Sequence, residues 1–151
     1  MNELYNACNL CPRKCHINRN VTTGVCNNTS SVKVARSALH YFEEPSISGS
    51  NGSGTIFFSG CNLKCCYCQN KEISTNNFGI NISIKRLSEL MLDLQSKGAN
   101  NINLVTPTHF VPSIIEAIKL ARRNGLTIPI VYNTSGYESV DTIKLLDGYV
   151  D

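Results

Sequence analysis

Residues 54–70 read GTIFFSGCNLKCCYCQN, a short apolar run followed directly by a loop with four cysteines. The run Thr55–Phe58 has the length and apolar character of a buried strand, and Ser59-Gly60 ends it. The loop contains the spacing Cys61-x3-Cys65-x2-Cys68, which places three thiols within eight residues. Parallel α/β proteins hold their active sites at the carboxyl ends of their strands. We therefore expect this loop to carry the chemistry of the protein.

Strands and helices alternate after this loop. Apolar runs at 102–105 and 128–132 predict two more strands, and a further strand is expected to begin at Tyr149-Val150. Three helices are expected from their capping residues and apolar stripes, over Ser83 to Gly98, Pro112 to Gly125 and Ser139 to Gly148. The third helix would bury Ile143 and Leu146.

This alternation predicts an α/β fold with parallel strands and right-handed crossovers. A closed eight-stranded barrel takes about 250 residues, whereas this chain has 151. We therefore expect a partial βα barrel, truncated after about three βα units, with a cysteine-rich N-terminal extension.

Three thiolates in one short loop can surround a compact metal centre. A structural zinc site is closed by four ligands, whereas three cysteines on a four-iron cluster leave one iron free for a substrate or cofactor. Cys66 could in principle supply a fourth thiolate, although adjacent side chains such as those of Cys65 and Cys66 tend to diverge. A zinc-stabilised binding module without catalysis is therefore the alternative hypothesis to an iron-sulfur enzyme.

The stretch GTIFFSGCNLKCCYCQN resembles the signature of the radical S-adenosylmethionine (SAM) superfamily, with Tyr67 at the aromatic position of that signature. The wider run EEPSISGSNGSGTIFFSGCNLKCCYCQNKEIS, with NINLVTPTHFVP and VYNTSGYES, resembles homologues of the pyruvate formate-lyase activating enzyme. By this resemblance the chain would be the front portion of such a protein. A fragment that binds the cluster without turnover is a third hypothesis.

The resemblance implies a reduced 4Fe-4S cluster that passes one electron into bound SAM, giving methionine and a 5'-deoxyadenosyl radical that abstracts hydrogen from a substrate. Cys61, Cys65 and Cys68 would hold the cluster. The residues expected to contact SAM by the same resemblance are Tyr67, Gln69, Thr106, Thr108 and Asn133. The expected partners are a reductant such as flavodoxin or ferredoxin and a glycyl radical enzyme as protein substrate.

Four more cysteines lie near the N-terminus, as Cys8-x2-Cys11-x3-Cys15-x10-Cys26. Four thiolates can close a structural zinc site or hold a second iron-sulfur cluster, although the spacing matches neither standard pattern closely. Reduced structural cysteines without a metal are the third alternative. The segment has little apolar periodicity, which suits a module held together by a metal. We therefore divide the chain into a metal-binding module (1–30), a connecting arm with a Gly/Ser-rich loop (31–54) and the barrel portion (55–151).

The charge and hydropathy of the chain argue against two classes of partner. The net charge is +3, lower than nucleic-acid binders usually carry, and we expect Arg13, Lys14, Arg19 and Arg36 on a solvated surface. No stretch approaches the roughly 20 apolar residues of a membrane span, and the N-terminus lacks a signal peptide's apolar centre. We therefore expect a soluble, cytoplasmic protein, in which clustered cysteines stay reduced and favour metal binding.

Overall fold

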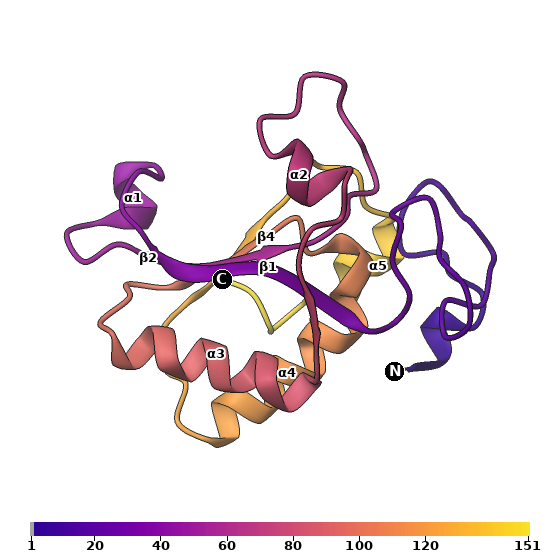
Figure 1. The fold of residues 1–151 in the computed structure, drawn as a ribbon. Helices are drawn as coiled ribbons and strands as arrows, with labels where there is room; N and C mark the ends of the chain where they lie inside the picture. The colour runs from indigo at the N-terminus through magenta and orange to yellow at the C-terminus, as the bar shows by residue number, and fades with distance from the viewer. Residues whose placement is uncertain (1) are drawn as a thin grey trace.

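A computed structural model describes residues 2–151 as a mixed five-stranded sheet with the order β3-β1-β2-β4-β5 (Figure 1). Its strands are β1 (Val32–His40), β2 (Ser53–Phe58), β3 (Ile80–Ile82), β4 (Ile102–Val105) and β5 (Ile130–Asn133). β2, β4 and β5 are parallel, whereas β1 pairs antiparallel with both β2 and β3. The α/β fold is thus confirmed, and β2, β4 and β5 are parallel as expected, but the sheet also contains the antiparallel strands β1 and β3.

The helices are α1 (Pro45–Ser48), α2 (Lys71–Ser74), α3 (Ile84–Ser96), α4 (Val111–Arg123) and α5 (Val140–Leu145), with 3-10 turns η1 (Asn2–Tyr5) and η2 (Thr108–Phe110). Within residues 2–151, no helix is long and apolar enough to cross a membrane. α3 and α4 lie together against one face of the sheet, below it in Figure 1. The predicted cap of α3 is confirmed, because the Ser83 hydroxyl accepts a hydrogen bond from the Arg86 N–H at 3.1 Å.

The main core lies between this pair of helices and the sheet. Apolar residues spaced three or four apart on each helix face the alternating inward residues of the strands. The fully buried members include Ile56, Leu87, Met91, Ile102, Leu104, Ile114 and Ile118. β2 occupies the centre of the sheet, so the loop that follows it starts from a rigid position.

Several element boundaries differ from the sequence expectation. β2 begins at Ser53, inside the expected Gly/Ser loop, because the backbone there already pairs with His40 of β1. The Ser53 hydroxyl also donates to the Asn101 side chain at 2.7 Å. α1 forms one helical turn ahead of it. β5 begins at Ile130, since Pro129 has no N–H to donate. The three-residue β3 was not expected, because its residues are largely exposed and form no apolar run.

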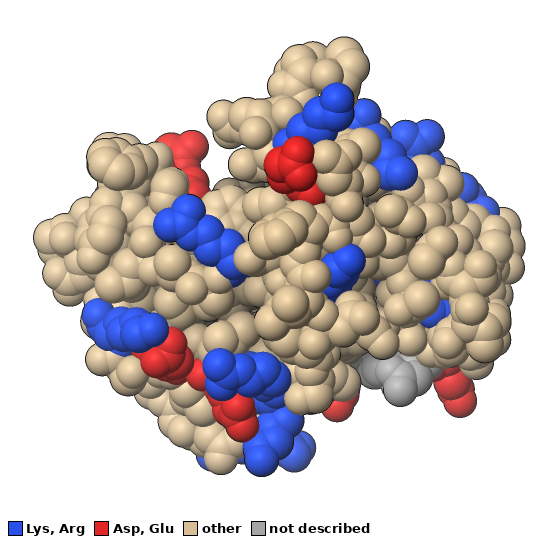
Figure 2. Space-filling view, in the orientation of Figure 1, with Lys and Arg blue, Asp and Glu red and all other residues tan. Residues whose placement is uncertain are grey.

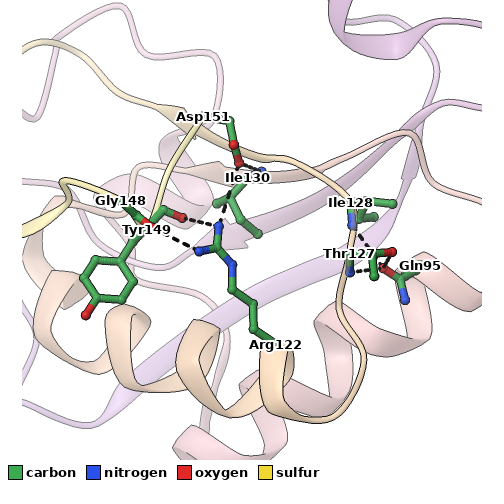
Figure 3. A network of polar contacts seen from close by, with 8 residues as sticks. All are labelled: Gln95, Arg122, Thr127, Ile128, Ile130, Gly148, Tyr149 and Asp151. Carbon is green, nitrogen blue, oxygen red and sulfur yellow. Dashed lines mark hydrogen bonds and ion pairs between the residues drawn. The ribbon is translucent and has the colours of Figure 1, made fainter.

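The segment after α5 is fixed by side chains of α4, as Figure 3 shows. The Arg122 guanidinium donates to the carbonyls of Gly148 (3.0 Å) and Tyr149 (3.2 Å). Asp151 exchanges hydrogen bonds with Ile130, through its backbone N–H at 3.0 Å and its carboxylate at 2.9 Å. The expected strand at Tyr149-Val150 is wrong for the described residues, although the chain does return beside β5.

The chain just before β5 is held by Gln95 of α3, which Figure 3 also shows. The Gln95 carbonyl oxygen accepts from the backbone N–H groups of Thr127 (2.8 Å) and Ile128 (3.2 Å). Three residues that precede the strand are thereby tied to the C-terminal turn of α3, because the Gln95 amide also donates to the Gly125 carbonyl at 2.9 Å.

Burial on α5 corrects one further expectation. Leu146 is buried against Val111 and Ile115 of α4, as expected, but Ile143 is 47% exposed. α5 has only six residues, with Leu146 directly after it, so only a few side chains of this segment can contact α4.

Matched isoleucine substitutions test this core. We expect Ile118→Ala to lower the free energy of unfolding by about 2–5 kcal/mol, because it leaves a cavity between α4 and the sheet. Ile143→Ala, also in a helix but exposed, should change it by less than about 0.5 kcal/mol. Urea denaturation of both variants measures the difference, and equal losses would contradict the assigned core.

Candidate functional site

Ser59, at the end of β2, fixes the point where the cysteine loop begins. Its N–H donates to the Lys33 carbonyl at 2.9 Å, and its hydroxyl donates to the Phe78 carbonyl at 2.5 Å. Its own carbonyl accepts from the Asn28 amide at 2.8 Å and from His109 Nε2 at 2.8 Å. Four separate segments therefore hold the residue that precedes Gly60-Cys61.

Gly60 allows the N-terminal residues to approach this point closely. Its φ of +78° lies in the left-handed region, and an added Cβ would overlap the Asn28 side chain and the Cys26 carbonyl. Only glycine can adopt this φ without strain and also leave room for Asn28 and the Cys26 carbonyl.

The loop thiols lie at the surface above the sheet, between β2 and α2. Cys61, Cys65 and Cys68 are each partly exposed, and Cys66 is exposed. The Leu63 N–H donates to the Cys61 sulfur at 3.4 Å, and the Ser74 hydroxyl of α2 donates to the Cys68 sulfur at 3.3 Å. Such donors stabilise negative charge on cysteine sulfur.

The residues expected to contact SAM fall into two groups. Tyr67 is 87% exposed and Gln69 is exposed, both on the cysteine loop. Thr106 and Asn133 are brought together at the carboxyl ends of β4 and β5, where the Thr106 N–H donates to the Asn133 carbonyl at 3.0 Å. The structure thus places the two groups on neighbouring strand ends of one sheet edge.

Thr106 and Thr108 differ in their surroundings. Thr106 has a φ of +58°, which is a strained conformation for a β-branched residue. Thr108 is buried, and its hydroxyl donates to the Glu138 carboxylate at 2.5 Å. Glu138 also accepts from the Thr134 hydroxyl. No motif in the sequence indicated Glu138, which links the segments that follow β4 and β5.

The four N-terminal cysteines gather around one cavity. Backbone pairing of residues 5–8 with residues 16–19 brings Cys8 beside Cys15, and a turn at Gly24 returns Cys26. The four side chains line a common small cavity, together with Arg19 and His109. Burial raises the pKa of the Cys11 and Cys26 thiols.

Arg19 contradicts the expectation of a solvated basic surface, because it is 1% exposed. Its guanidinium donates to the carbonyls of Asn28 (3.1 Å), Thr29 (2.6 Å) and His109 (2.6 Å), and its Nη1 lies 3.8 Å from the Cys8 sulfur. The same group stacks over the rings of Tyr5 and Phe110, with the guanidinium carbon 5.0 and 5.8 Å from the ring centroids. Carbonyl oxygens far apart in sequence supplied no pattern from which this burial could have been predicted.

Arg13 connects the N-terminal residues to the cysteine loop directly. Its side chain donates to the carbonyls of Asn62 (3.0 Å) and Leu63 (3.3 Å), which lie between Cys61 and Cys65. The Asn62 amide donates in turn to the Tyr137 carbonyl at 2.6 Å. The cysteine loop is therefore held both by the N-terminal segment, through Arg13, and by the segment after β5, through Tyr137.

His109 is buried and neutral. Burial, reinforced by the charge of Arg19, lowers its pKa to about 3. Its Nε2 must carry the proton, because it donates to the carbonyl of Ser59. Among the described residues no donor reaches its Nδ1.

The spacing of the thiols is wider than a bound metal ion requires. Within residues 2–151, no group of three His, Cys, Asp or Glu side chains is close enough together to hold a metal ion. The loop and the N-terminal segment supply the predicted cysteine donors, three in one and four in the other.

Comparison with known proteins decides the family. A family model described as the radical SAM superfamily matches residues 55–151, which is most of the chain. This chain belongs to the radical SAM superfamily. An uncharacterized protein of Methanocaldococcus jannaschii (MJ0674) is 31% identical over 158 residues, covering 99% of this chain and 44% of that protein. The radical SAM chain thus spans less than half the length of this relative, and no solved structure gives a significant match.

Radical SAM proteins typically use a 4Fe-4S cluster and SAM, and the donor set of the loop fits such a cluster chemically. Three partly exposed thiols follow the first parallel strand of the radical SAM domain, and hydrogen-bond donors reach two of the sulfurs. Cys61, Cys65 and Cys68 remain the predicted ligands. The three-part division of the chain also stays a prediction.

A glycine comparison tests the close approach at Gly60. We expect Gly125→Ala, with a φ of +97° and open space around it, to lower the free energy of unfolding by about 1 kcal/mol. Gly60→Ala should cost at least about 2 kcal/mol more, because the Cys26 carbonyl and Asn28 must also move. Urea denaturation distinguishes the two, and similar losses would show that the N-terminal segment is not seated against Gly60.

The buried His109 should make stability depend on pH. The unfolded state binds the extra proton below its ordinary pKa of 6.5, whereas the folded state does so only near 3. Stability is therefore complete above about pH 6.5 and is lost as the pH falls toward 3. Between pH 7 and 5 we expect a loss of about 2 kcal/mol from this group.

The control for this prediction is His109→Gln, whose amide can still donate to the Ser59 carbonyl but does not titrate. Urea denaturation of reduced, chelator-treated protein at pH 7 and pH 5 should show the smaller loss in the variant. The same pH dependence in both proteins would contradict the assignment.

Proposed function

We propose that this protein is a radical SAM enzyme that cleaves SAM reductively and uses the resulting radical to abstract hydrogen, in the manner of glycyl-radical-enzyme activating proteins. The observation that supports this most directly is the Cys61-x3-Cys65-x2-Cys68 loop at the carboxyl end of the first parallel strand of a radical SAM domain. When bound, the cluster supplies the electron that breaks SAM into methionine and a 5'-deoxyadenosyl radical.

The side chains of the protein would orient the reactants. Cys61, Cys65 and Cys68 would hold the cluster, and the Leu63 N–H and the Ser74 hydroxyl would tune it through their hydrogen bonds to the Cys61 and Cys68 sulfurs. The carboxyl ends of parallel strands lie at one edge of a sheet, so the Thr106 turn and Asn133 are on the edge where SAM would bind. Tyr67 is free to close over the cofactor, since its ring is exposed.

The surface around the loop suits an electron carrier. Lys64 and Lys71 are exposed on the loop and at the start of α2, and Figure 2 shows basic side chains over this upper part of the molecule. Acidic side chains lie among them in the same view, and the exposed Glu72 follows Lys71 directly. Along α3 basic and acidic side chains also lie side by side, as in the pairs Lys97–Asp93 and Arg86–Glu89. We propose that flavodoxin or ferredoxin docks by the loop and that a glycyl radical enzyme is the substrate.

Cys65→Ala tests the function, with Cys66→Ala as its matched neighbour. After anaerobic reconstitution with iron and sulfide, we expect the Cys65→Ala protein to lose the reduced 4Fe-4S signal in electron paramagnetic resonance. Its SAM cleavage, measured as 5'-deoxyadenosine, should fall at least about tenfold, since an iron ligand is removed.

The Cys66→Ala protein should keep both the signal and its change on addition of SAM. The proposal is contradicted by a wild-type signal that is absent or does not respond to SAM, or by an unchanged signal in Cys65→Ala.

A further inference from the structure

The cavity around the N-terminal cysteines contains an electrostatic imbalance. Arg19 is a permanently charged cation that is almost completely buried beside it. Its hydrogen-bond partners are carbonyls and the Cys8 sulfur, and within residues 2–151 no carboxylate lies within ion-pair distance of it. Burying a charge without a counter-charge is strongly unfavourable.

The groups placed to supply that counter-charge are the cysteine sulfurs. All four line the cavity next to the guanidinium, and the Cys8 sulfur is 3.8 Å from it. A tetrathiolate of a divalent metal carries two negative charges. Arg19 and Arg13, the two cations that line the same cavity, would balance them.

The size of the cavity indicates a single ion. Its volume is about 10 Å³, which is the space of one water-sized sphere. A 4Fe-4S core has eight atoms and would require the four segments to move apart. Gly24 lies close to two of the sulfurs, because an added Cβ there would be in van der Waals contact with the Cys15 sulfur (3.4 Å) and the Cys26 sulfur (3.8 Å).

His109 closes the cavity on the side of the turn after β4. Its ring is 2% exposed and lines the cavity, and its Nδ1 meets no donor among the described residues. Because burial keeps the ring neutral, His109 adds no positive charge beside Arg19 and leaves the four thiols as the groups that can carry negative charge there.

We infer that Cys8, Cys11, Cys15 and Cys26 bind one zinc ion as a tetrathiolate, with Arg19 as its buried counter-charge. Four-cysteine closure is typical of structural zinc, which takes no part in redox chemistry. The site would hold together a segment that has only a small apolar cluster of its own, formed by Tyr5, Cys8 and Leu10.

The test uses the full chain with Cys61, Cys65 and Cys68 all changed to Ser, so that the result is independent of the proposed function. Metal analysis after anaerobic purification and a chelator wash should give about one zinc and no iron per chain. Adding Cys15→Ser to this background should lower the zinc content at least about tenfold, whereas adding Cys66→Ser should leave it unchanged.

Two further measurements keep the test decisive if Cys15→Ser fails to fold. X-ray absorption at the zinc edge of the triple variant should show four sulfur neighbours at about 2.3 Å. Competition with a chelator should show zinc binding weakened at least about tenfold in Arg19→Met but not in Arg36→Met, which removes an exposed arginine. Iron and sulfide in the triple variant, the absence of zinc, or nitrogen and oxygen ligands in place of sulfur would overturn the inference.

Discussion

The hydrogen bonds of Ser59 are the constraint on which the site depends. β2 is buried within the sheet, so the polar groups at its end cannot be left to water and must find partners in the protein. Ser59 meets this requirement with partners before and after it in the chain, at positions 28, 33, 78 and 109. The cysteine loop therefore starts from a point that is fixed in position and direction, and a displacement of any partner would be transmitted to the thiols.

Arg19 imposes the second constraint, because a buried guanidinium has strict requirements for partners. Its N–H groups must donate to oxygen atoms of the protein. The chain provides carbonyls from two distant segments, at Asn28-Thr29 and at His109. His109 then joins the two constraints, since its backbone accepts from Arg19 while its ring donates to Ser59. The N-terminal cysteines and the cysteine loop are thus connected through one residue of the turn after β4.

Local patterns in the sequence predicted the parallel half of the fold well. The apolar runs of β2, β4 and β5, the cap at Ser83 and the stripes of α3 and α4 each depend on neighbours within one element, and the structure confirms them. The antiparallel pairing of β1 and β3 was not predicted, because it is decided by contacts between distant segments. The same reason explains the site: cysteine spacing shows in the sequence, whereas the burial of Arg19 and the role of Ser59 arise only from the folded chain. The ligand roles of the loop cysteines stay predictions.

The sequence distance between Arg19 and its acceptor at His109 also affects how the protein is made. Synthesis proceeds from the N-terminus, so residues 1–30 leave the ribosome well before β4 and the turn after it exist. Until then the guanidinium has no buried acceptor at His109, and the cavity that the cysteines line lacks one of its walls. The N-terminal thiols consequently pass through a nascent stage in which they are open to oxidants and to competing ions, and only completion of the turn encloses them.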